Sequence, residues 1–477
     1  MAFNSIQFII FFIIVVGVYY AIPHRFRWML LLAASYYFYM CWKAEYVLLI
    51  IFSTLVDYYC GLAMGRQPDK NGRRKFMVLS LVVNLGVLFA FKYFNLFNDS
   101  LRSVLGSVNI FYGVPAFKVL LPVGISFYTF QTLSYSIDVY RGEKEPEKHL
   151  GIFALYVAFF PQLVAGPIER SVRLLPQFYQ KQVWRYENLT AGGRLMLWGF
   201  FKKIVIADRL AAFVNPVYNH PHEYSGLIIL LATYAFAFQI YCDFAGYSDI
   251  AIGAARILGI DLMTNFDRPY LARNIADFWK RWHISLTTWF RDYVYIPLGG
   301  NRCATRQWVR NIVLVFLLSG LWHGANWTFV LWGGLHAFYY LIYRRWLDLK
   351  NRYGWNTDTP LAQIGGVFVT FHAVVFSWIF FRANTVSDAF YLAGNLFGGI
   401  HPGAFFTYFP VNQCILLLLI AGVIAVKVLF GSEGRLRPQR IGVAGQALYA
   451  QVFYAMVINF LLFFYVHAYE PFIYFQF

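Results

Sequence analysis

The sequence predicts an all-α, polytopic integral membrane protein. Of its 477 residues, 59% are hydrophobic and 13% are charged, whereas soluble domains carry roughly 25% charged residues. The mean hydropathy is +0.52, which excludes a soluble enzyme, a disordered chain and a nucleic-acid-binding domain as the main interpretation. A transmembrane helix needs about 20 mostly apolar residues, and a membrane β-barrel would show alternating segments of about ten residues instead.

Apolar stretches follow one another along almost the whole chain. We expect about 11 to 13 membrane-embedded helices from them and, because no repeat or low-complexity linker separates them, one integral domain over residues 1–477. The stretch 159–170 contains Pro161 and Pro167, which predicts a re-entrant element, because broken helices at membrane depth survive only inside protein or beside a cavity. The stretches lie at 5–22, 28–42, 44–63, 76–96, 116–137, 151–165, 190–209, 224–243, 309–323, 326–344, 363–381, 409–430 and 446–467.

The net charge of +17 is interpreted as membrane topology, not as nucleic-acid binding. The strongly basic loop 64–75 predicts a cytoplasmic loop under the positive-inside rule. No basic region precedes the first stretch, so we expect an uncleaved first span with an external N-terminus. Five cysteines without a CxxC pair indicate neither a disulfide framework nor a zinc knuckle. We expect no metal site, although His220 and His222 offer two possible ligands.

The segment 264–308 is too polar to span a membrane but is rich in aromatic residues. Its apolar residues recur at three- and four-residue steps, which predicts one amphipathic helix lying in the membrane interface. His283 falls beside the apolar face, so the helix is either a structural interfacial element or part of a site. The face consists of Ile275, Phe278, Trp279, Trp282, Leu286, Trp289, Phe290 and Tyr293.

His323 is the first candidate for chemistry, because it sits in the apolar run 317–334. Ionisable side chains at membrane depth are costly and mark functional sites by default. Gly320 and Gly324 flank it and allow another backbone to come close. A neutral imidazole in this place can accept a proton from a hydroxyl; alternatively, His323 is a structural residue bonded to a neighbouring helix. Its sequence neighbours include Trp322, Asn326 and Trp327.

Other polar residues near apolar runs allow two interpretations each. Asp243 fits a relay or ion site, or the cap of a broken helix. Arg173 can meet a phosphate or pair with Glu169. Lys202 and Lys203 are expected to snorkel to an interface and not to catalyse.

The C-terminal aromatic tail, residues 470–477, contains Tyr474. The tail is either an anchor in the aromatic belt of a membrane or a mobile end whose hydroxyl accepts an acyl group.

Seven motifs occur in a specific order along nearly the whole chain. They are LLLAASYYFYMCW (30–42), LPVGISFYTFQTLSYSIDVYRG (121–142), GPIERSVRLLPQF (166–178), FAGYSDIAIG (244–253), NFDRPYLARNIADFWKRWHISLTTWFRDYVYIPLGGNR (265–302), LSGLWHGANWTFVLWGGLHAFY (318–339) and FFRANTVSDAFYLAGNLF (380–397). With these motifs the chain resembles the membrane-bound O-acyltransferases. The resemblance is to their bacterial branch, which includes alginate and peptidoglycan O-acetyltransferases and the membrane protein of teichoic-acid D-alanylation.

The resemblance implies a ring of helices around a central tunnel in the bacterial cytoplasmic (inner) membrane. It implies that His323 is the central catalytic residue and that His283 is the second essential one, with segment 264–308 on the cytoplasmic side. The tail resembles the aromatic end of the small partner protein in D-alanylation systems, which implies that Tyr474 carries the acyl group. We expect further residues to line or support the tunnel: Trp279, Trp282, Trp322, Asn326 and Asp243.

The function expected from this resemblance is transfer of an acyl group, most simply acetyl, from a cytoplasmic thioester donor such as acetyl-CoA. The group would cross the membrane and reach an extracytoplasmic polysaccharide through a separate periplasmic or extracellular transferase of the SGNH-hydrolase type, with a Ser-His-Asp site. No permanently bound cofactor and no nucleic-acid partner are expected, and the membrane lipids surround the chain. Two alternatives stay open: a transporter or flippase for a cell-envelope glycan precursor, and an acyltransferase that acts on lipid or protein.

Overall fold

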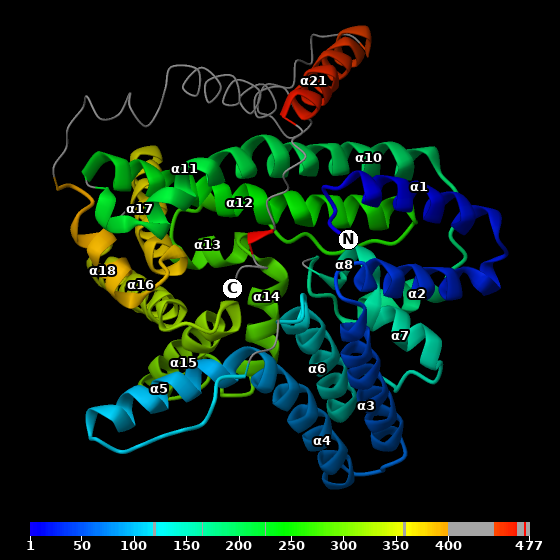
Figure 1. Ribbon diagram of the computed structural model, residues 1–477, viewed down its shortest axis with the longest axis horizontal. Helices are drawn as coiled ribbons and strands as arrows, with labels where there is room; N and C mark the ends of the chain where they lie inside the picture. Colours follow the sequence, from blue (N-terminus) through cyan, green and yellow to red (C-terminus); the bar gives the residue numbers. More distant parts are fainter. Residues whose placement is uncertain are drawn as a thin grey trace. The chain divides into compact units, whose positions relative to one another are not determined.

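The regular structure of the chain is entirely helical in the part that is described. A computed structural model describes residues 1–117, 121–164, 166–224, 226–355, 359–398, 443–464 and 472–473 (Figure 1). Every regular element in these ranges is a helix, which confirms the predicted all-α class. The total of about 11 to 13 embedded helices and their ring arrangement remain predictions. Among the described residues, four helical stretches are long and apolar enough to cross a membrane: Ala44–Gly65, Lys70–Ser107, Gly226–Ile257 and Pro360–Arg382.

The described chain divides into two compact units, and the expected single domain over residues 1–477 remains a prediction. The described residues of the first unit lie within Met1–Met196 and Ser248–Ala373, and those of the second lie within Leu197–Tyr247 and Val374–Ile473. Helices α10 (Tyr186–Phe200), α12 (Gly226–Ile257) and α17 (Pro360–Arg382) contribute residues to both units. The second unit also contains α11 (Asp208–Asn219), α18 (Val386–Gly394) and α21 (Val443–Phe464). The first unit contains α1 (Ile6–Ala21), α2 (His24–Met40), α3 (Val47–Gly65), α4 (Lys70–Leu88), α5 (Phe94–Ser107), α6 (Ile125–Arg141), α7 (Leu150–Ala158), α8 (Phe160–Leu163), α9 (Ser171–Tyr179), α13 (Ile275–Arg281), α14 (Ile284–Phe290), α15 (Thr305–His323) and α16 (Trp327–Tyr353).

Helices α3, α4 and α6 pack side by side around a buried carboxylate (Figure 1). Asp57 on α3 is fully buried, and its oxygens accept hydrogen bonds from Ser80 and Asn84 on α4 and from Ser136 on α6. Polar groups at membrane depth need such partners, because no water is present to replace them. The network therefore fixes the three helices to one another through hydrogen bonds as well as through apolar packing.

The helical stretch Lys70–Ser107 changes direction part-way along its length. Between α4 and α5 it passes through a π-helical segment, η2 (Phe89–Tyr93), and the two helices run in different directions on either side of it (Figure 1). A π-helical turn inserts one residue into the ladder and is frequent at functional sites. This segment carries Lys92, which reaches the site described below.

The stretch 159–170 is a broken helix, and its re-entrant course in the membrane remains a prediction. Helix α7 ends at Ala158, the four-residue α8 follows, and residues 166–170 have no regular structure. Pro161 occupies the first turn of α8, where its missing N–H costs no helical hydrogen bond. The residues of α8 are buried in protein, which is the setting that a broken helix requires.

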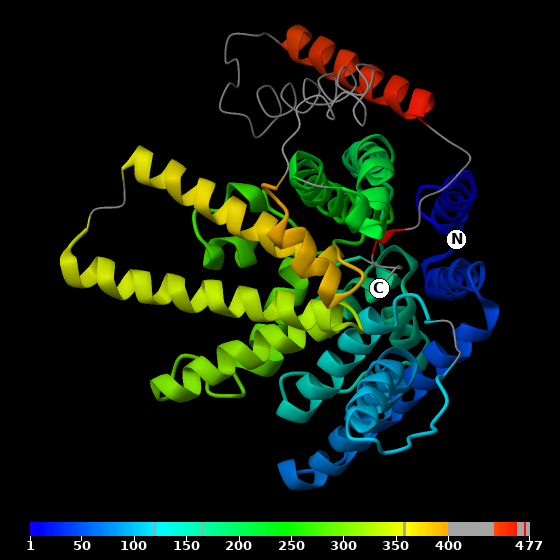
Figure 2. The same cartoon turned by 60° about the vertical axis from the view of Figure 1, so that its left-hand side comes forward.

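Helices α15 and α16 form a tight hairpin, drawn side by side in Figure 2. Gly320 on α15 and Gly333 on α16 meet at the crossing, where a Cβ atom on Gly320 would collide with the carbonyl of Phe329 and one on Gly333 with the carbonyl of Phe316. Only glycine permits this backbone-to-backbone approach. The hairpin places His323, the last residue of α15, directly before the turn into α16.

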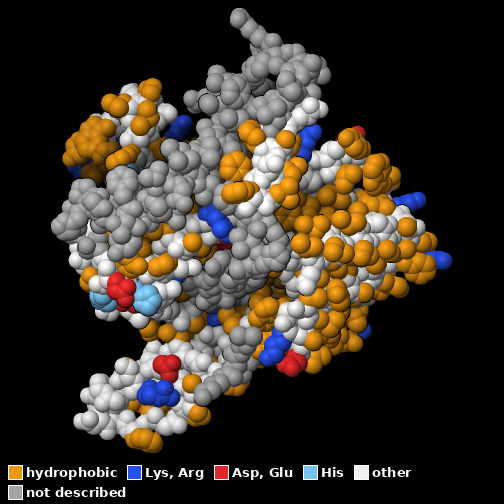
Figure 3. Space-filling model, turned by 45° about the horizontal axis from the view of Figure 1, so that its top comes forward, with side chains coloured by type: hydrophobic (Ala, Val, Ile, Leu, Met, Phe, Trp, Pro, Cys, Tyr) orange, Lys and Arg blue, Asp and Glu red, His pale blue; other side chains and the backbone are white. Residues whose placement is uncertain are grey.

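Large hydrophobic side chains lie exposed on the outside of the first unit. On α1 the exposed positions include Ile9, Ile10, Ile13 and Ile14. Figure 3 shows hydrophobic side chains gathered over a broad face that few charged side chains interrupt. Such a face is too large for a soluble monomer and fits contact with lipid.

Replacing Gly333 with alanine should destabilise the protein. The new methyl group meets the Phe316 carbonyl, which belongs to the backbone and cannot turn away, so we expect a loss of about 1–3 kcal/mol. The measurement is the melting temperature of the purified protein in detergent.

The neighbouring Gly334→Ala variant is the matched control. Its methyl group would meet only a Leu317 methyl, at an ordinary 3.9 Å, and alanine favours the helix by about 1 kcal/mol. Equal destabilisation by the two substitutions would contradict the proposed close approach.

Candidate active site

His323 lies at the centre of a buried cluster of aromatic rings. The residue is 2% exposed, and its ring centroid is 5.0 Å from that of Trp322 and 5.0 Å from that of Trp332, with the ring planes nearly perpendicular in both pairs. The two tryptophans come from the two helices of the α15–α16 hairpin. His336, one turn further along α16, lies 4.8 Å from Trp332, and Trp279 of α13 lies 4.9 Å from His336. The cluster therefore joins α13 to the hairpin.

His283 belongs to the same cluster. It is fully buried, and its ring centroid is 6.3 Å from that of His323 and 5.7 Å from that of Trp322. Phe127 of α6 stacks on its ring at 6.3 Å. The two histidines selected from the sequence, 40 positions apart in the chain, thus come together in one buried aromatic cluster.

The single amphipathic helix expected in segment 264–308 is wrong, because the helix is broken at His283. Helix α13 ends at Arg281, and α14 begins at Ile284. His283 between them has φ +44 and ψ 55, a left-handed conformation that is uncommon for a residue other than glycine. Such backbone strain persists only where the surroundings fix it, and it clusters at functional sites.

Asn265 fixes this break. Its backbone carbonyl accepts the N–H of Ile284 at 2.9 Å, and its side-chain oxygen accepts the N–H of Ser285 at 3.3 Å and the Ser285 hydroxyl at 2.9 Å. The first N–H groups of a helix have no partner within the helix, so Asn265 caps α14 in place of the usual N-cap side chain. The same oxygen lies 3.1 Å from Nδ1 of His283.

This contact defines which nitrogen of His283 carries a proton. The Asn265 amide nitrogen donates to the Ser248 hydroxyl at 3.3 Å, so the atom that faces His283 is the oxygen, which only accepts. Nδ1 must therefore donate, and Nε2 of the neutral ring is the accepting nitrogen. Burial lowers the pKa of His283 to about 3, so the ring is neutral at physiological pH and can serve as a base or as a hydrogen-bond acceptor.

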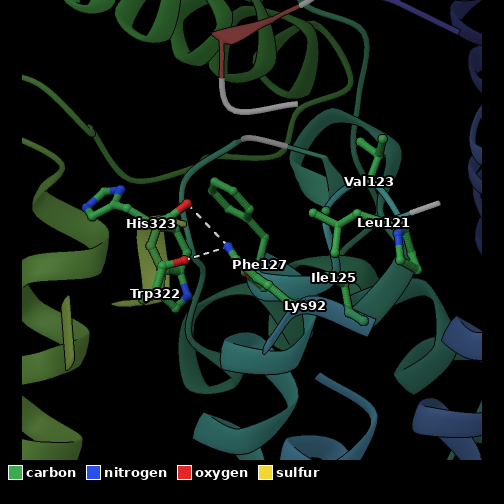
Figure 4. A pocket seen from close by; sticks show the side chains of 10 residues that line it. Lys92, Leu121, Val123, Ile125, Phe127, Trp322 and His323 are labelled. Atoms are coloured by element: carbon green, nitrogen blue, oxygen red, sulfur yellow. Dashed lines mark hydrogen bonds between the residues drawn. The ribbon is translucent and has the colours of Figure 1, made fainter. Parts of the chain in front are cut away.

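Lys92 approaches His323 from the opposite side. Its ammonium group donates to the backbone carbonyl of Trp322 at 2.7 Å, to that of His323 at 3.3 Å and to the hydroxyl of Ser126 at 3.2 Å. Figure 4 shows the lysine reaching these carbonyls while the imidazole of His323 points away from it. The last carbonyls of a helix have no partner within the helix, and the N–H donors of Lys92 satisfy two of them here. Lys92 therefore fixes the end of α15 at the residue whose ring enters the cluster.

A pocket of about 40 Å³ opens beside these groups, roughly the room that one or two water molecules occupy. Its lining includes Lys92 and His323, and the carbonyl of His323 faces the lysine there (Figure 4). The remaining lining residues are Leu121, Pro122, Val123, Gly124, Ile125, Ser126, Phe127 and Trp322.

Comparison with known proteins agrees with this geometry. The model of the membrane-bound O-acyltransferase family matches residues 149–383, which include both histidines and the α15–α16 hairpin. A probable alginate O-acetylase AlgI from Pseudomonas aeruginosa is 40% identical over 394 residues, which cover 82% of this chain and 73% of that protein. The chain belongs to the membrane-bound O-acyltransferase family.

Two further relatives act on other acceptors. A peptidoglycan O-acetyltransferase from Helicobacter pylori is 33% identical over 414 residues, or 81% of this chain and 76% of that protein. A teichoic acid D-alanyltransferase from Bacillus subtilis is 29% identical over 284 residues, or 57% of this chain and 71% of that protein. The chain is thus a membrane-bound O-acyltransferase.

The structure brings together most of the predicted supporting residues of this acyltransferase. Trp279, Trp282 and Trp322 are buried in the aromatic cluster or against it, since Trp282 stacks on Phe278 at 5.6 Å. Asn326 caps α16, because its side chain accepts the N–H of Thr328 at 3.1 Å. Asp243 belongs to the second compact unit, and Tyr474 lies outside the described residues. A tunnel lined by these side chains remains a prediction.

Three residues of the site were missed by the sequence analysis. Lys92 is a single cation within an apolar run, a signal that could have identified it. His336 is likewise an ionisable residue in an apolar run. Asn265 gives no comparable signal, because its role depends on contacts 18 and 20 positions later in the chain.

Two expectations about charged residues are now resolved. Lys203 does not snorkel to an interface: it is 4% exposed and pairs with Asp208 and Asp243. Arg173 lies 3.7 Å from a carboxyl oxygen of Glu169 and 2.6 Å from one of Asp261, the contact that the pairing interpretation predicts, and contact with a phosphate remains a prediction. Among the described residues, no three His, Cys, Asp or Glu side chains are arranged to hold a metal ion.

The stability of the protein should decrease as the pH is lowered from 7 to 5, and His283 should cause part of this decrease. The pKa of His283 is about 3 in the folded protein and about 6.5 in the unfolded chain. Below pH 6.5 the imidazole therefore binds a proton in the unfolded chain but stays neutral in the folded protein. Stability contributed by the neutral ring is therefore present above pH 6.5 and is lost toward pH 3, amounting to about 2 kcal/mol by pH 5. The melting temperature should drop more between pH 7 and pH 5 in the wild type than in His283→Gln.

Glu169 provides a control of opposite sign. Burial raises its pKa to about 7, so stability contributed by the protonated carboxyl is present below pH 4.5 and is lost as the pH rises toward 7. Glu169→Gln should remove the loss of stability toward pH 7 and keep the loss toward acidic pH that His283 causes. Parallel pH profiles of the wild type and both variants would refute the assignment.

Proposed function

We propose that this acyltransferase takes an acetyl group from a cytoplasmic thioester, acetyl-CoA, and passes it across the bacterial cytoplasmic membrane for O-acetylation of an extracytoplasmic polysaccharide. The observation that carries the proposal is the pair of fully buried histidines, His283 and His323, with ring centroids 6.3 Å apart. Both lie in the part of the chain that matches the family. The names of the relatives, which act on alginate, peptidoglycan and teichoic acid, support a polysaccharide of the cell envelope as the final acceptor.

His323 is proposed as the general base of the transfer. Its imidazole takes the proton of an acceptor hydroxyl, and the hydroxyl oxygen attacks the thioester carbonyl. The carbon–sulfur bond then breaks, and the departing thiolate takes up the proton that His323 holds. The products are an ester on the acceptor and a free thiol, so atoms and charge balance.

His283 is proposed to assist this proton transfer. Asn265 holds its Nδ1, which leaves Nε2 as the accepting nitrogen and orients the ring within the cluster. Lys92 is proposed to keep the carbonyl end of α15 in place, so that the His323 ring stays directed into the cluster. Fixed orientation of this kind contributes strongly to rate, because misplacement by about 1 Å can cost 100-fold.

Tyr474 is proposed as the first acceptor and carrier of the acetyl group. A separate periplasmic or extracellular transferase of the SGNH-hydrolase type would then move the group from the tyrosine to the polymer. Two proteins are needed because acetyl-CoA is cytoplasmic whereas the polymer lies outside the membrane. The ring of helices, the tunnel and the cytoplasmic position of segment 264–308 belong to the same proposal.

His323→Ala should abolish acetyl transfer while the protein remains in the membrane. The substitution removes the proposed base, and loss of general-base catalysis typically costs 10²–10⁴-fold. The assay is release of the free thiol from acetyl-CoA by the purified protein together with its partner. His372→Ala is the matched control, because His372 on α17 bonds to the carbonyl of Phe368 and lies outside the cluster. Retained turnover in His323→Ala would end the assignment.

Tyr474→Phe tests the carrier separately. The substitution keeps an aromatic ring for anchoring but removes the hydroxyl oxygen that would form the ester. With acetyl-labelled acetyl-CoA, mass spectrometry should find label on the C-terminal peptide of the wild type and none on that of Tyr474→Phe or His323→Ala. Thioester turnover without a labelled peptide would keep the enzyme and reduce the tail to an anchor.

A further inference from the structure

The second compact unit contains a buried cluster of three charged side chains, Lys203, Asp208 and Asp243. The ammonium of Lys203 lies 2.8 Å from a carboxylate oxygen of Asp208 and 2.6 Å from Oδ1 of Asp243. Lys203 is 4% exposed and Asp243 is 2% exposed. Burying such charges is costly unless every group finds partners.

The C-terminal tail supplies the hydrogen-bond donor for the second carboxylate oxygen of Asp243. The backbone N–H of Ile473 donates to Oδ2 of Asp243 at 2.7 Å, so each oxygen of this carboxylate has its own partner. A hydrogen bond from a neutral donor to a buried carboxylate is about twice as strong as one between neutral groups. The bond uses a main-chain atom, so it holds the path of the tail regardless of the side chain at that position.

A slot for the preceding side chain adds to this contact. Phe472 is 1% exposed, and its ring lies 5.6 Å from that of Phe244 and 4.6 Å from that of Tyr247. Both rings stand on α12, within one turn of Asp243. The tail therefore makes two contacts with α12: the backbone N–H of Ile473 binds Asp243, and the ring of Phe472 packs against Phe244 and Tyr247.

The local backbone explains why the short Asp243 side chain can reach Lys203. Lys203 belongs to a π-helical segment, η3 (Phe201–Ala207). A Cβ atom on Gly246 of α12 would lie 2.8 Å from the carbonyl oxygen of Gly199 and 3.2 Å from the nitrogen of Lys203. The helices thus approach backbone to backbone at this point, which brings the lysine within reach of the aspartate.

We infer that the Lys203–Asp243 pair and the Phe244–Tyr247 slot form a docking site for the chain's own C-terminal tail, which fixes the backbone at the residue directly before Tyr474. Consecutive Cα atoms lie about 3.8 Å apart, so an anchor at Ile473 restricts the space that Tyr474 can sample. Asp243 is thereby a positioning residue. The consequence for acyl transfer rests on the function proposed above, whereas the docking itself does not.

Hydrogen–deuterium exchange of the full-length protein tests the docking without any reaction. The Ile473 amide should exchange slowly in the wild type, and in Asp243→Ala it should exchange about 10- to 100-fold faster, the ratio that a hydrogen bond to a charged group represents. The variant is suited to the purpose, because Lys203 keeps Asp208 as a partner and no charge is left unpaired.

Asp208→Ala is the matched control. It removes the other carboxylate from Lys203 but leaves Asp243 and its bond to Ile473, so the slow exchange of the Ile473 amide should persist. Fast exchange of this amide in the wild type, or equal exchange in wild type and Asp243→Ala, would overturn the docking site.

The positioning role is tested with Ile473→Pro and Ile473→Val. Proline has no N–H to donate to Asp243, whereas valine keeps it. Ile473→Pro should lower kcat for labelling of the tail by roughly tenfold or more relative to Ile473→Val, with the KM for acetyl-CoA unchanged. Equal kcat values would overturn the positioning role.

The two experiments separate this inference from the function on which part of it rests. If the Ile473 amide behaves as expected but Tyr474 is never acetylated, the docking site stands and the carrier proposal falls. If Tyr474 is acetylated while the Ile473 amide exchanges freely, the carrier stands and the docking site falls.

Discussion

The close approach of α15 and α16 at Gly320 and Gly333 is the constraint on which the site depends. Because neither helix has a side chain at the crossing, the backbones touch and the hairpin becomes narrow enough to hold Trp322 and Trp332 against the same imidazole. A wider crossing would separate the two indoles and open the pocket around His323. The position of the central histidine therefore depends on Gly320 and Gly333, because a Cβ atom at either residue would push the two helices apart.

His283 is positioned by a different device. The chain turns into a left-handed conformation at this residue, and the resulting helix start would expose N–H groups in a buried place. Asn265 supplies acceptors for those groups and also for Nδ1 of the ring. One side chain thus stabilises the strained backbone and selects the tautomer. Orientation and protonation of His283 cannot be changed independently of the fold around it.

The sequence was sufficient for the fold class and for selecting two histidines that the structure brings together, and their catalytic role remains a prediction. The signal for His323 is its place in an apolar run, and the signal for His283 is its place beside the apolar face of segment 264–308. Low charge and long apolar runs require helices in a membrane, and an ionisable residue within such a run stands out against its neighbours. The break at His283 could not be predicted. Apolar residues recur at helical spacing on both sides of the break, so the periodicity passes through it unchanged. The break becomes stable only through Asn265, which no local pattern connects to it.

Lys92 and Asp243 show why the partners of some buried charges escape analysis of a sequence. Each satisfies part of its charge with the backbone of a distant segment: Lys92 with the carbonyls that end α15, and Asp243 with the amide of Ile473. Reasoning from residue types pairs side chains with side chains, and a backbone partner has no residue type that could reveal it. The same property makes such contacts useful in a membrane. A buried charge needs a partner, and a backbone group offers one at any position where a chain end or a helix end comes near. The charge then fixes the path of that segment and leaves its side chains available for chemistry.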